Sequence, residues 1–168
     1  MSRFVRTLNL IKTHRSSEWL TPSQAEALSA LKQVIRVPGT VNLCGRAGAG
    51  KTFLAWVAAD MLDYAYFPHL TYFSEVESIA TADVIIDNAD PSKISHREIL
   101  KALQFRGIKH ALVITRQLIQ DYTYYVELSL TKEDWDKACD NLACVGCRMP
   151  GSRFANLWHL VNPNLRRI

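Results

Sequence analysis

A glycine-rich segment holds the residues of this chain that are best suited to chemistry. The run Gly45-Arg46-Ala47-Gly48-Ala49-Gly50-Lys51-Thr52 fits the pattern of a phosphate-binding loop. Glycines let the backbone turn so that successive N–H groups point at a phosphate, and Lys51 supplies the cation that bridges two phosphate groups. We therefore expect a nucleotide to contact Gly45, Arg46, Ala47, Gly48, Ala49, Gly50, Lys51, Thr52 and Phe53.

A second chemical element is the run Val84-Ile85-Ile86-Asp87, an apolar strand that ends in an acid. A carboxylate at this place holds Mg²⁺ and its water shell beside bound phosphates. The Thr52 hydroxyl is the other expected ligand, so Thr52 and Asp87 form the predicted magnesium site. Because an acid at a strand end also serves solubility alone, the prediction for Asp87 depends on the glycine-rich segment.

The elements that must position these residues alternate between strand and helix. Thr21, Pro22 and Gln24 form a helix start for residues 22–36, and Ser95 with Glu98 forms another that Gly107 ends. We expect a further helix over 52–62 and one that begins at Thr131. Apolar runs predict strands over residues 40–44, 69–74, 83–87, 110–115 and 124–130. The pattern predicts a three-layer α/β/α sandwich with a mainly parallel sheet of about five strands.

Composition agrees with an ordinary globular protein. The 168 residues are 48% hydrophobic and 21% charged, and the formal net charge of +4 is too small to require an anionic partner. Without an uninterrupted apolar stretch of about 18 residues, we expect no membrane span. The four cysteines do not form the dense pattern of a secreted disulfide framework, so we expect a cytoplasmic setting.

We divide the chain into an N-terminal arm and helix (1–37), a nucleotide-binding core (38–131) and a C-terminal helical extension (132–168). Residues 1–17 contain four basic side chains and no acid. A short helix docked on the core is the preferred interpretation, with a presequence or a nucleic-acid arm as alternatives. The C-terminal extension presents either a solvated face or a nucleic-acid surface. Its basic and aromatic residues are Arg148, Arg153, Phe154, Trp158, Arg166 and Arg167.

Together these features resemble the additional-strand class of P-loop ATPases, which includes AAA+, RecA-like and STAND proteins. Within that class the sequence is most similar to the STAND or NB-ARC nucleotide-binding domain, over residues 38–142. Those domains follow the acid-tipped strand with a helix, a strand ending in Thr-Arg, and a strand whose Leu-Ser or Leu-Thr turn enters a helix. Here the matching segments are Ala111-Leu112-Val113-Ile114-Thr115-Arg116 and Val126-Glu127-Leu128-Ser129-Leu130-Thr131-Lys132-Glu133-Asp134-Trp135. The resemblance implies that Arg116 senses the γ-phosphate.

The sequence departs from this pattern where hydrolysis is concerned. Asn88 occupies the position after Asp87 where the class often has an acid that orients the attacking water, and an amide is no base. Another carboxylate must then activate the attacking water. We select Glu75, which we expect at the end of the strand over 69–74, and Asp90 is the alternative. The predicted catalytic residues are then Glu75, Asp87 and Arg116. STAND proteins usually also carry a helical lid and a winged helix, for which this chain leaves no room.

Cys139, Cys144 and Cys147 have a spacing that resembles part of an iron–sulfur pattern, and His159 is a further ligand for zinc. Because a fourth ligand with local spacing is missing, we prefer three small residues that pack a helix and its exit.

The resulting hypothesis is an ATP-dependent switch. Mg-ATP binds at the loop, hydrolysis is slow, and the bound state controls self-assembly into a homo-oligomer or binding to a larger protein assembly. Arg97 and Arg106 are candidates for an arginine that completes the site of a neighbouring subunit. The alternative is a RecA or AAA+ motor or loader whose ATPase is stimulated by nucleic acid. A small-molecule kinase is disfavoured because no Arg-rich lid segment follows the predicted sheet.

Overall fold

The sheet of this protein is parallel throughout. The computed structural model describes residues 9–89 and 95–146, and in them five strands form one sheet in the order β2-β3-β4-β1-β5. Strand β4 pairs with both β1 and β3, so one additional strand separates the strand before the glycine-rich loop from the strand before Asp87. The strands are β1 (Gly39–Cys44), β2 (Ala65–Phe67), β3 (Asp83–Ile86), β4 (His110–Ile114) and β5 (Tyr124–Glu127).

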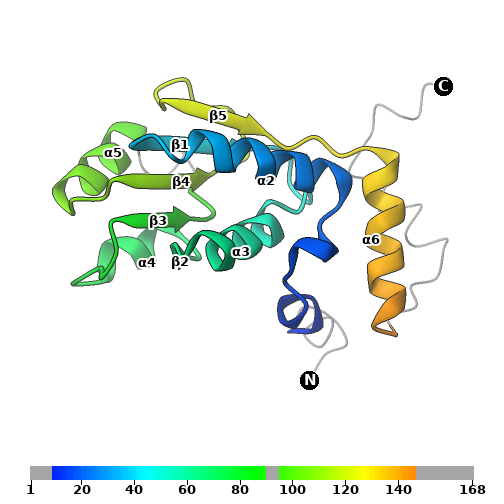
Figure 1. Ribbon diagram of the computed structural model, residues 1–168. Coiled ribbons are helices and arrows are strands. Elements are labelled where there is room, and N and C mark those ends of the chain that lie inside the picture. Colours follow the sequence, from blue (N-terminus) through cyan, green and yellow to red (C-terminus); the bar gives the residue numbers. More distant parts are fainter. Residues whose placement is uncertain (1–8, 90–94, 147–168) are drawn as a thin grey trace.

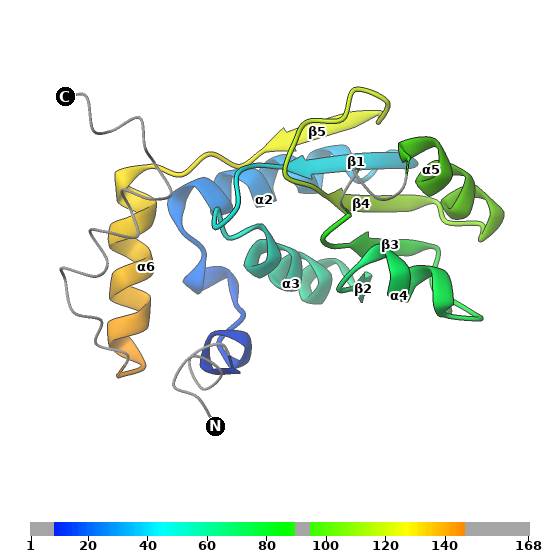
Figure 2. The same cartoon turned by 180° about the vertical axis from the view of Figure 1, so that it is seen from behind.

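Helices cover both faces of this sheet. Figure 1 shows α2 and α3 in front of the strands, and Figure 2 shows α4 and α5 on the opposite face. Helix α6 lies beyond the edge where the strands end (Figure 1). The labelled helices are the 3-10 turn η1 (Ser17–Trp19), α2 (Pro22–Val34), α3 (Lys51–Leu62), α4 (Leu70–Glu75), α5 (His96–Phe105) and α6 (Lys132–Cys144). Residues 9–13 are helical as well. The predicted three-layer α/β/α sandwich is confirmed.

Successive side chains of each strand point to opposite faces of the sheet, which produces two hydrophobic cores. On β4, Leu112 and Ile114 pack with α2 and α3, whereas Ala111 and Val113 pack with α4 and α5. Both sets are almost fully buried, as the near-continuous apolar runs in the sequence predict for parallel strands covered on two sides. Helix α2 contributes Leu31 to the first core and is therefore packed against the sheet.

The prediction of a strand over residues 69–74 is wrong. Leu70–Glu75 forms α4, because the His69 ring accepts a hydrogen bond from the Tyr72 N–H at 3.1 Å and caps the helix start. Leu70 and Phe73, three residues apart, are the buried residues of this helix. The strand lies earlier, at β2, whose three residues pair in register with β3.

The other predicted elements are confirmed with shifted ends. Helix α2 starts with Pro22 at its first position, and the Thr21 N–H donates to the Gln24 Oε1 atom at 2.9 Å. Helix α5 starts with the Ser95–Glu98 capping box and ends before Gly107, which has a φ of 67°. Strand β5 ends at Glu127, earlier than residue 130. None of the described helices is long and apolar enough to span a membrane.

Helix α6 is attached to the start of α2 by a buried carboxylate. Asp134 is 1% exposed; it accepts hydrogen bonds from the Ser23 N–H at 2.8 Å and the Ser23 hydroxyl at 2.7 Å. It also accepts from the N–H and hydroxyl of Thr131, at 2.6 and 2.8 Å, and so caps its own helix. Burial alone raises the pKa of Asp134, but the hydrogen bonds from Ser23 and Thr131 outweigh burial and lower the pKa to about 2.

We expect Asp134→Ala to lower the free energy of unfolding by about 2–3 kcal/mol at neutral pH, because buried donors lose a charged acceptor. The folded pKa lies below the ordinary value, so this stabilisation is complete above pH ~4 and is lost as the pH falls towards 2. Urea unfolding of wild type and variant across this range measures the difference, which should shrink in acid. Asp136→Ala, an exposed acid on the same helix, is the control; a pH-independent difference would contradict the prediction.

Candidate functional site

The glycine-rich loop joins β1 to the start of α3, as the sequence predicted. Gly45 has a φ of 153°, and a Cβ there would lie 2.5 Å from the Leu128 carbonyl oxygen, so no side chain fits. Gly50, with a φ of 81°, precedes the first helical residue of α3. Arg46, Ala47 and Gly48 are exposed, Ala49 is buried, and Lys51, Thr52 and Phe53 are partly buried. The loop is therefore open to solvent where its backbone turns and anchored at both ends.

Lys51 lies inside this turn. Its ammonium donates hydrogen bonds to the carbonyl oxygens of Gly45 at 2.6 Å and Arg46 at 2.8 Å. Burial lowers the pKa of Lys51, nearby Asp87 opposes that effect, and the positive charge of Arg116 adds to it. Asp87 and Arg116 are therefore both close enough to Lys51 to affect its charge.

Asp87 follows β3 at the edge of the sheet that carries the loop. It is 1% exposed, and its two carboxylate oxygens accept from the Asn88 N–H at 2.7 Å and from the Tyr66 hydroxyl at 2.9 Å. Burial and the Asp87 carboxylate both raise the pKa of Tyr66, which keeps this hydroxyl protonated and able to donate. Tyr66 lies on β2, the strand that the sequence analysis did not find, so its contact with Asp87 was missed.

Arg116 follows β4 in a turn that a buried amide holds. Asn42, fully buried in the middle of β1, donates to the Val113 carbonyl at 3.1 Å and to the Thr115 hydroxyl at 2.9 Å. Its side-chain oxygen accepts from the Ile119 N–H at 3.0 Å. The turn that carries Arg116 is thereby fixed to the strand that leads into the loop. The sequence analysis missed Asn42, although a polar residue within a mostly apolar strand indicates a buried hydrogen-bonding role.

Gln24 also reaches the loop. Its side-chain oxygen serves the predicted capping box, and its Nε2 atom donates to the Gly50 carbonyl at 3.0 Å. The sequence identified Gln24 only as a helix-start residue, since the second contact joins segments 26 residues apart.

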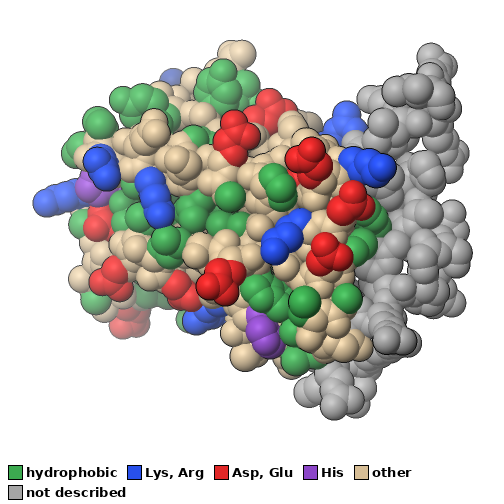
Figure 3. Space-filling model, turned by 45° about the vertical axis from the view of Figure 1, so that its right-hand side comes forward, with side chains coloured by type: hydrophobic (Ala, Val, Ile, Leu, Met, Phe, Trp, Pro, Cys, Tyr) green, Lys and Arg blue, Asp and Glu red, His purple; other side chains and the backbone are tan. Residues whose placement is uncertain are grey.

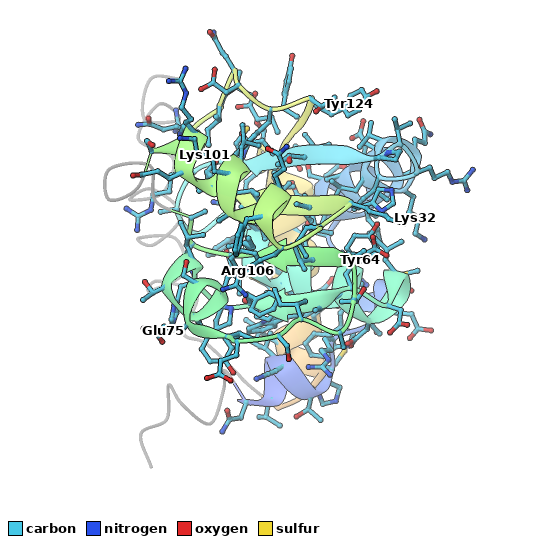
Figure 4. The ribbon with its side chains drawn as sticks, turned by 90° about the vertical axis from the view of Figure 1, so that its left-hand side faces the viewer. Lys32, Tyr64, Glu75, Lys101, Arg106 and Tyr124 are labelled. Carbon is cyan, nitrogen blue, oxygen red and sulfur yellow. The ribbon has the colours of Figure 1, made fainter. Side chains whose placement is uncertain are left out.

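Glu75 lies away from this site. It is exposed at the end of α4, between Ser74 and Val76, whose carbonyl oxygens accept hydrogen bonds from the Arg106 guanidinium at 2.9 and 2.6 Å. Figure 4 shows Glu75 and Arg106 on the side of the molecule where Tyr64 and Tyr124 lie, near the starts of β2 and β5. The strand-end argument for Glu75 therefore no longer applies, and Arg106 is held by its own chain.

The position after Asp87 has an unusual backbone. Asn88 adopts a φ of 47°, which Asn tolerates better than most residues, and its side chain donates to the Pro68 carbonyl at 3.2 Å. Exposed at the carboxyl edge, it supplies an amide where a water-orienting acid would stand. Asp90 lies outside the described residues.

The predicted cysteine ligands are only partly described. Cys139 and Cys144 are free thiols on α6, and Cys147 and His159 lie outside the described residues. Within residues 9–89 and 95–146, no group of three or more His, Cys, Asp or Glu side chains is placed to hold a metal ion.

Comparison with known proteins supports the fold. No family model and no curated protein matches the chain. Among solved structures, the replication initiator DnaA bound to AMPPCP and single-stranded DNA is similar with a TM-score of 0.52 at 15% identity, over 79% of this chain and 54% of that chain. AMPPCP-bound DnaA from Aquifex aeolicus gives a TM-score of 0.45 at 13% identity, with the same coverage. The chain thus spans about half the length of the solved structures it matches.

The likeness at a TM-score of 0.52 concerns the fold alone. This chain therefore shares with DnaA a fold in which helices cover both faces of a parallel sheet.

We expect Asn42→Ala to lower the free energy of unfolding by about 2–4 kcal/mol, because the buried Ile119 N–H loses its acceptor, and the Val113 carbonyl and the Thr115 hydroxyl each lose a donor. Urea denaturation measures the loss, with exposed Gln104→Ala as the matched amide control. An Asn42→Ala variant as stable as the control would show that the buried amide does not hold the β4 turn.

Proposed function

We propose that this protein binds ATP at the loop over residues 45–52 and uses the bound nucleotide as a switch that controls self-assembly or partner binding. The observation that carries the proposal is the convergence of Lys51, Asp87 and Arg116 around a glycine-rich turn at a helix N-terminus. An anion placed between the Lys51 ammonium and the Arg116 guanidinium would be attracted by both cations. A triphosphate supplies that anion together with acceptors for the loop N–H groups.

In this proposal Lys51 changes partners when the nucleotide binds. Its ammonium leaves the carbonyl oxygens of Gly45 and Arg46 for phosphate oxygens, which are stronger acceptors because they are charged. Arg116 is exposed beside it and has the length to reach a terminal phosphate, which ADP lacks. The occupied site therefore differs between ATP and ADP at Arg116, as a switch requires.

The donor set fits Mg²⁺. Asp87 supplies a buried carboxylate, and Thr52 supplies a hydroxyl on the first turn of α3; both are hard oxygen donors of the kind that Mg²⁺ prefers. Bound there, the ion would neutralise phosphate charge. Tyr66 and the Asn88 N–H each use one lone pair of the Asp87 carboxylate and orient it.

Slow hydrolysis follows from the residues at the carboxyl edge. Asn88 is no base, and Asp87 is committed to its hydrogen bonds and to the ion. A charge from a second subunit would complete such a site, and Arg97, exposed on the first turn of α5, is our candidate donor. This arrangement links ATP to assembly, in agreement with the resemblance to STAND domains. A cytoplasmic location stays a prediction.

The alternative function is a nucleic-acid-stimulated ATPase. One structural neighbour is DnaA bound to single-stranded DNA. Figure 3 shows Lys and Arg side chains of this chain interspersed with Asp and Glu on the visible face of the described residues. Because mixed charge attracts a phosphate backbone less than a basic stripe does, we favour the switch.

We expect Lys51→Ala to weaken ATP binding at least ~100-fold, because the charge-assisted contact from the loop lysine to phosphate disappears. Isothermal titration with Mg-ATP measures the loss. Lys101→Ala, an exposed lysine on α5, is the control. Tight binding by the Lys51 variant would refute the site assignment.

We expect Arg116→Ala to weaken ATP binding about tenfold while ADP binding stays unchanged, since the lost contact is to the terminal phosphate. The same preparations distinguish the two functions. Light scattering should show a larger mass with Mg-ATP than with ADP or no nucleotide, and phosphate release should be slow and indifferent to single-stranded DNA. Arg36→Ala, an exposed arginine after α2, is the control. DNA-stimulated release would favour the alternative.

A further inference from the structure

A set of hydrogen bonds, joined through the backbone of residues 21–24, links the glycine-rich loop to α6. It begins at Gln24, which is 4% exposed and whose Nε2 atom donates to the Gly50 carbonyl at 3.0 Å. The contact is tight, because a Cβ added at Gly50 would lie 2.3 Å from the same Nε2 atom. A buried amide is thus fitted against the last residue of the loop.

This contact bears on how the loop presents its N–H groups. The Gly50 carbonyl also accepts the first helical bond of α3, from the Leu54 N–H at 3.0 Å. In a trans peptide the carbonyl and the following N–H point in opposite directions. Two donors that hold the Gly50 carbonyl towards the helix therefore hold the Lys51 N–H towards the loop, where a phosphate would lie. A phosphate that accepts from this N–H polarises the peptide and strengthens the bond on its other side.

The other end of the set reaches α6 through the start of α2. The Gln24 side-chain oxygen accepts from the Thr21 N–H, and the next residue but one, Ser23, donates twice to Asp134 of α6. Asp134 holds Thr131 at the start of its own helix through two further bonds. Residues 21–24, named here the bridge segment, therefore connect the loop to the N-terminus of α6.

A second contact on the same helix strengthens this connection. The Asn141 side chain, two turns further along α6, donates to the Trp19 carbonyl at 2.8 Å. Trp19 lies two residues before the bridge segment, so α6 contacts this part of the chain at two places along its length. Figure 1 places α6 at the carboxyl edge of the sheet, on the side of the loop.

We propose that Gln24 is a positioning residue of the phosphate-binding loop and that the bridge segment couples nucleotide occupancy to the docking of α6. The proposal rests on the proposed function, because it requires ATP at the loop. The coupling between nucleotide binding and the docking of α6 is positive. Bound phosphate favours the Gln24–Gly50 contact, which orders the bridge segment and tightens the contact between Ser23 and Asp134. Helix α6 is then the element through which the switch is read.

Two backbone N–H groups report this coupling directly, those of Ser23 and Thr131, which both donate to Asp134. We expect saturating Mg-ATP to slow their hydrogen exchange in the full chain roughly fivefold or more. Nuclear magnetic resonance measures exchange at each N–H, and titration calorimetry on the same sample gives the bound fraction.

Two variants of Gln24 separate coupling from folding. Gln24→Glu keeps the oxygen that caps α2 and loses the donor to Gly50, and Gln24→Met removes both without adding charge. In each variant, saturating Mg-ATP should slow hydrogen exchange at the Ser23 and Thr131 N–H groups less than twofold. Gln104→Met, an exposed glutamine on α5, should respond as wild type does.

The reverse effect follows from linkage, because coupling between two sites is reciprocal. Asp134→Ala should weaken ATP binding by up to the factor by which ATP slows exchange in wild type, whereas exposed Asp136→Ala should leave affinity unchanged. If the Asp134→Ala variant does not fold, the Gln24 variants still test the proposal.

The outcomes separate this proposal from the proposed function. ATP that binds tightly without slowing exchange at Ser23 and Thr131 overturns the coupling and leaves the nucleotide site intact. An undiminished response in both Gln24 variants overturns the role of Gln24. Absence of ATP binding overturns the proposed function itself.

Discussion

The parallel sheet places every functional group of this molecule. Because β1, β3, β4 and β5 run in one direction, the residues that follow them emerge at a single edge. The loop after β1, Asp87 after β3 and Arg116 after β4 are distant in sequence and adjacent in space for this reason. The parallel arrangement is in turn imposed by helices that cover both faces, since each connecting helix returns the chain to the opposite edge.

Polar side chains that are buried at or near that edge must find hydrogen-bonding partners within the protein. Asn42 and Asp87 are almost wholly removed from water, and an unpaired polar group there would cost about 1–3 kcal/mol. Each meets this requirement with partners from another element: Asn42 with the turn after β4, and Asp87 with Tyr66 of β2. The bonds that satisfy buried groups are therefore the same bonds that fix the geometry of the site.

Three charged side chains act on one another at this edge. Burial lowers the pKa of Lys51, the Asp87 carboxylate opposes that effect, and the positive charge of Arg116 adds a smaller lowering. In this structure the Lys51 ammonium donates hydrogen bonds to the carbonyl oxygens of Gly45 and Arg46. Under the proposed function, such a site would distinguish ATP from ADP by the number and position of their negative charges.

The sequence by itself predicted the glycine-rich loop with its flanking strand and helix, the positions of Asp87 and Arg116 after strands, and the layered fold class. These follow from local rules: glycines permit the turn, continuous apolar runs form buried strands, and capping residues start helices. Strand β2 was not predicted, because a three-residue strand carries almost no periodicity, and aromatic residues in α4 imitated one. Glu75 was consequently selected on a strand end that does not exist.

Only the tertiary structure decided the roles of Tyr66, Asn42, Gln24 and Asp134. Each makes its decisive contact with a residue at least 21 positions away, and Ser23 lies 111 positions from Asp134. Locally, Asn42 is only a polar residue in an apolar strand and Gln24 only a helix-start residue, so no short pattern reveals the distant partners of these side chains. The physical reason is that a buried polar side chain is specified by the partner that packing brings to it, and packing is a property of the whole sheet and its helices.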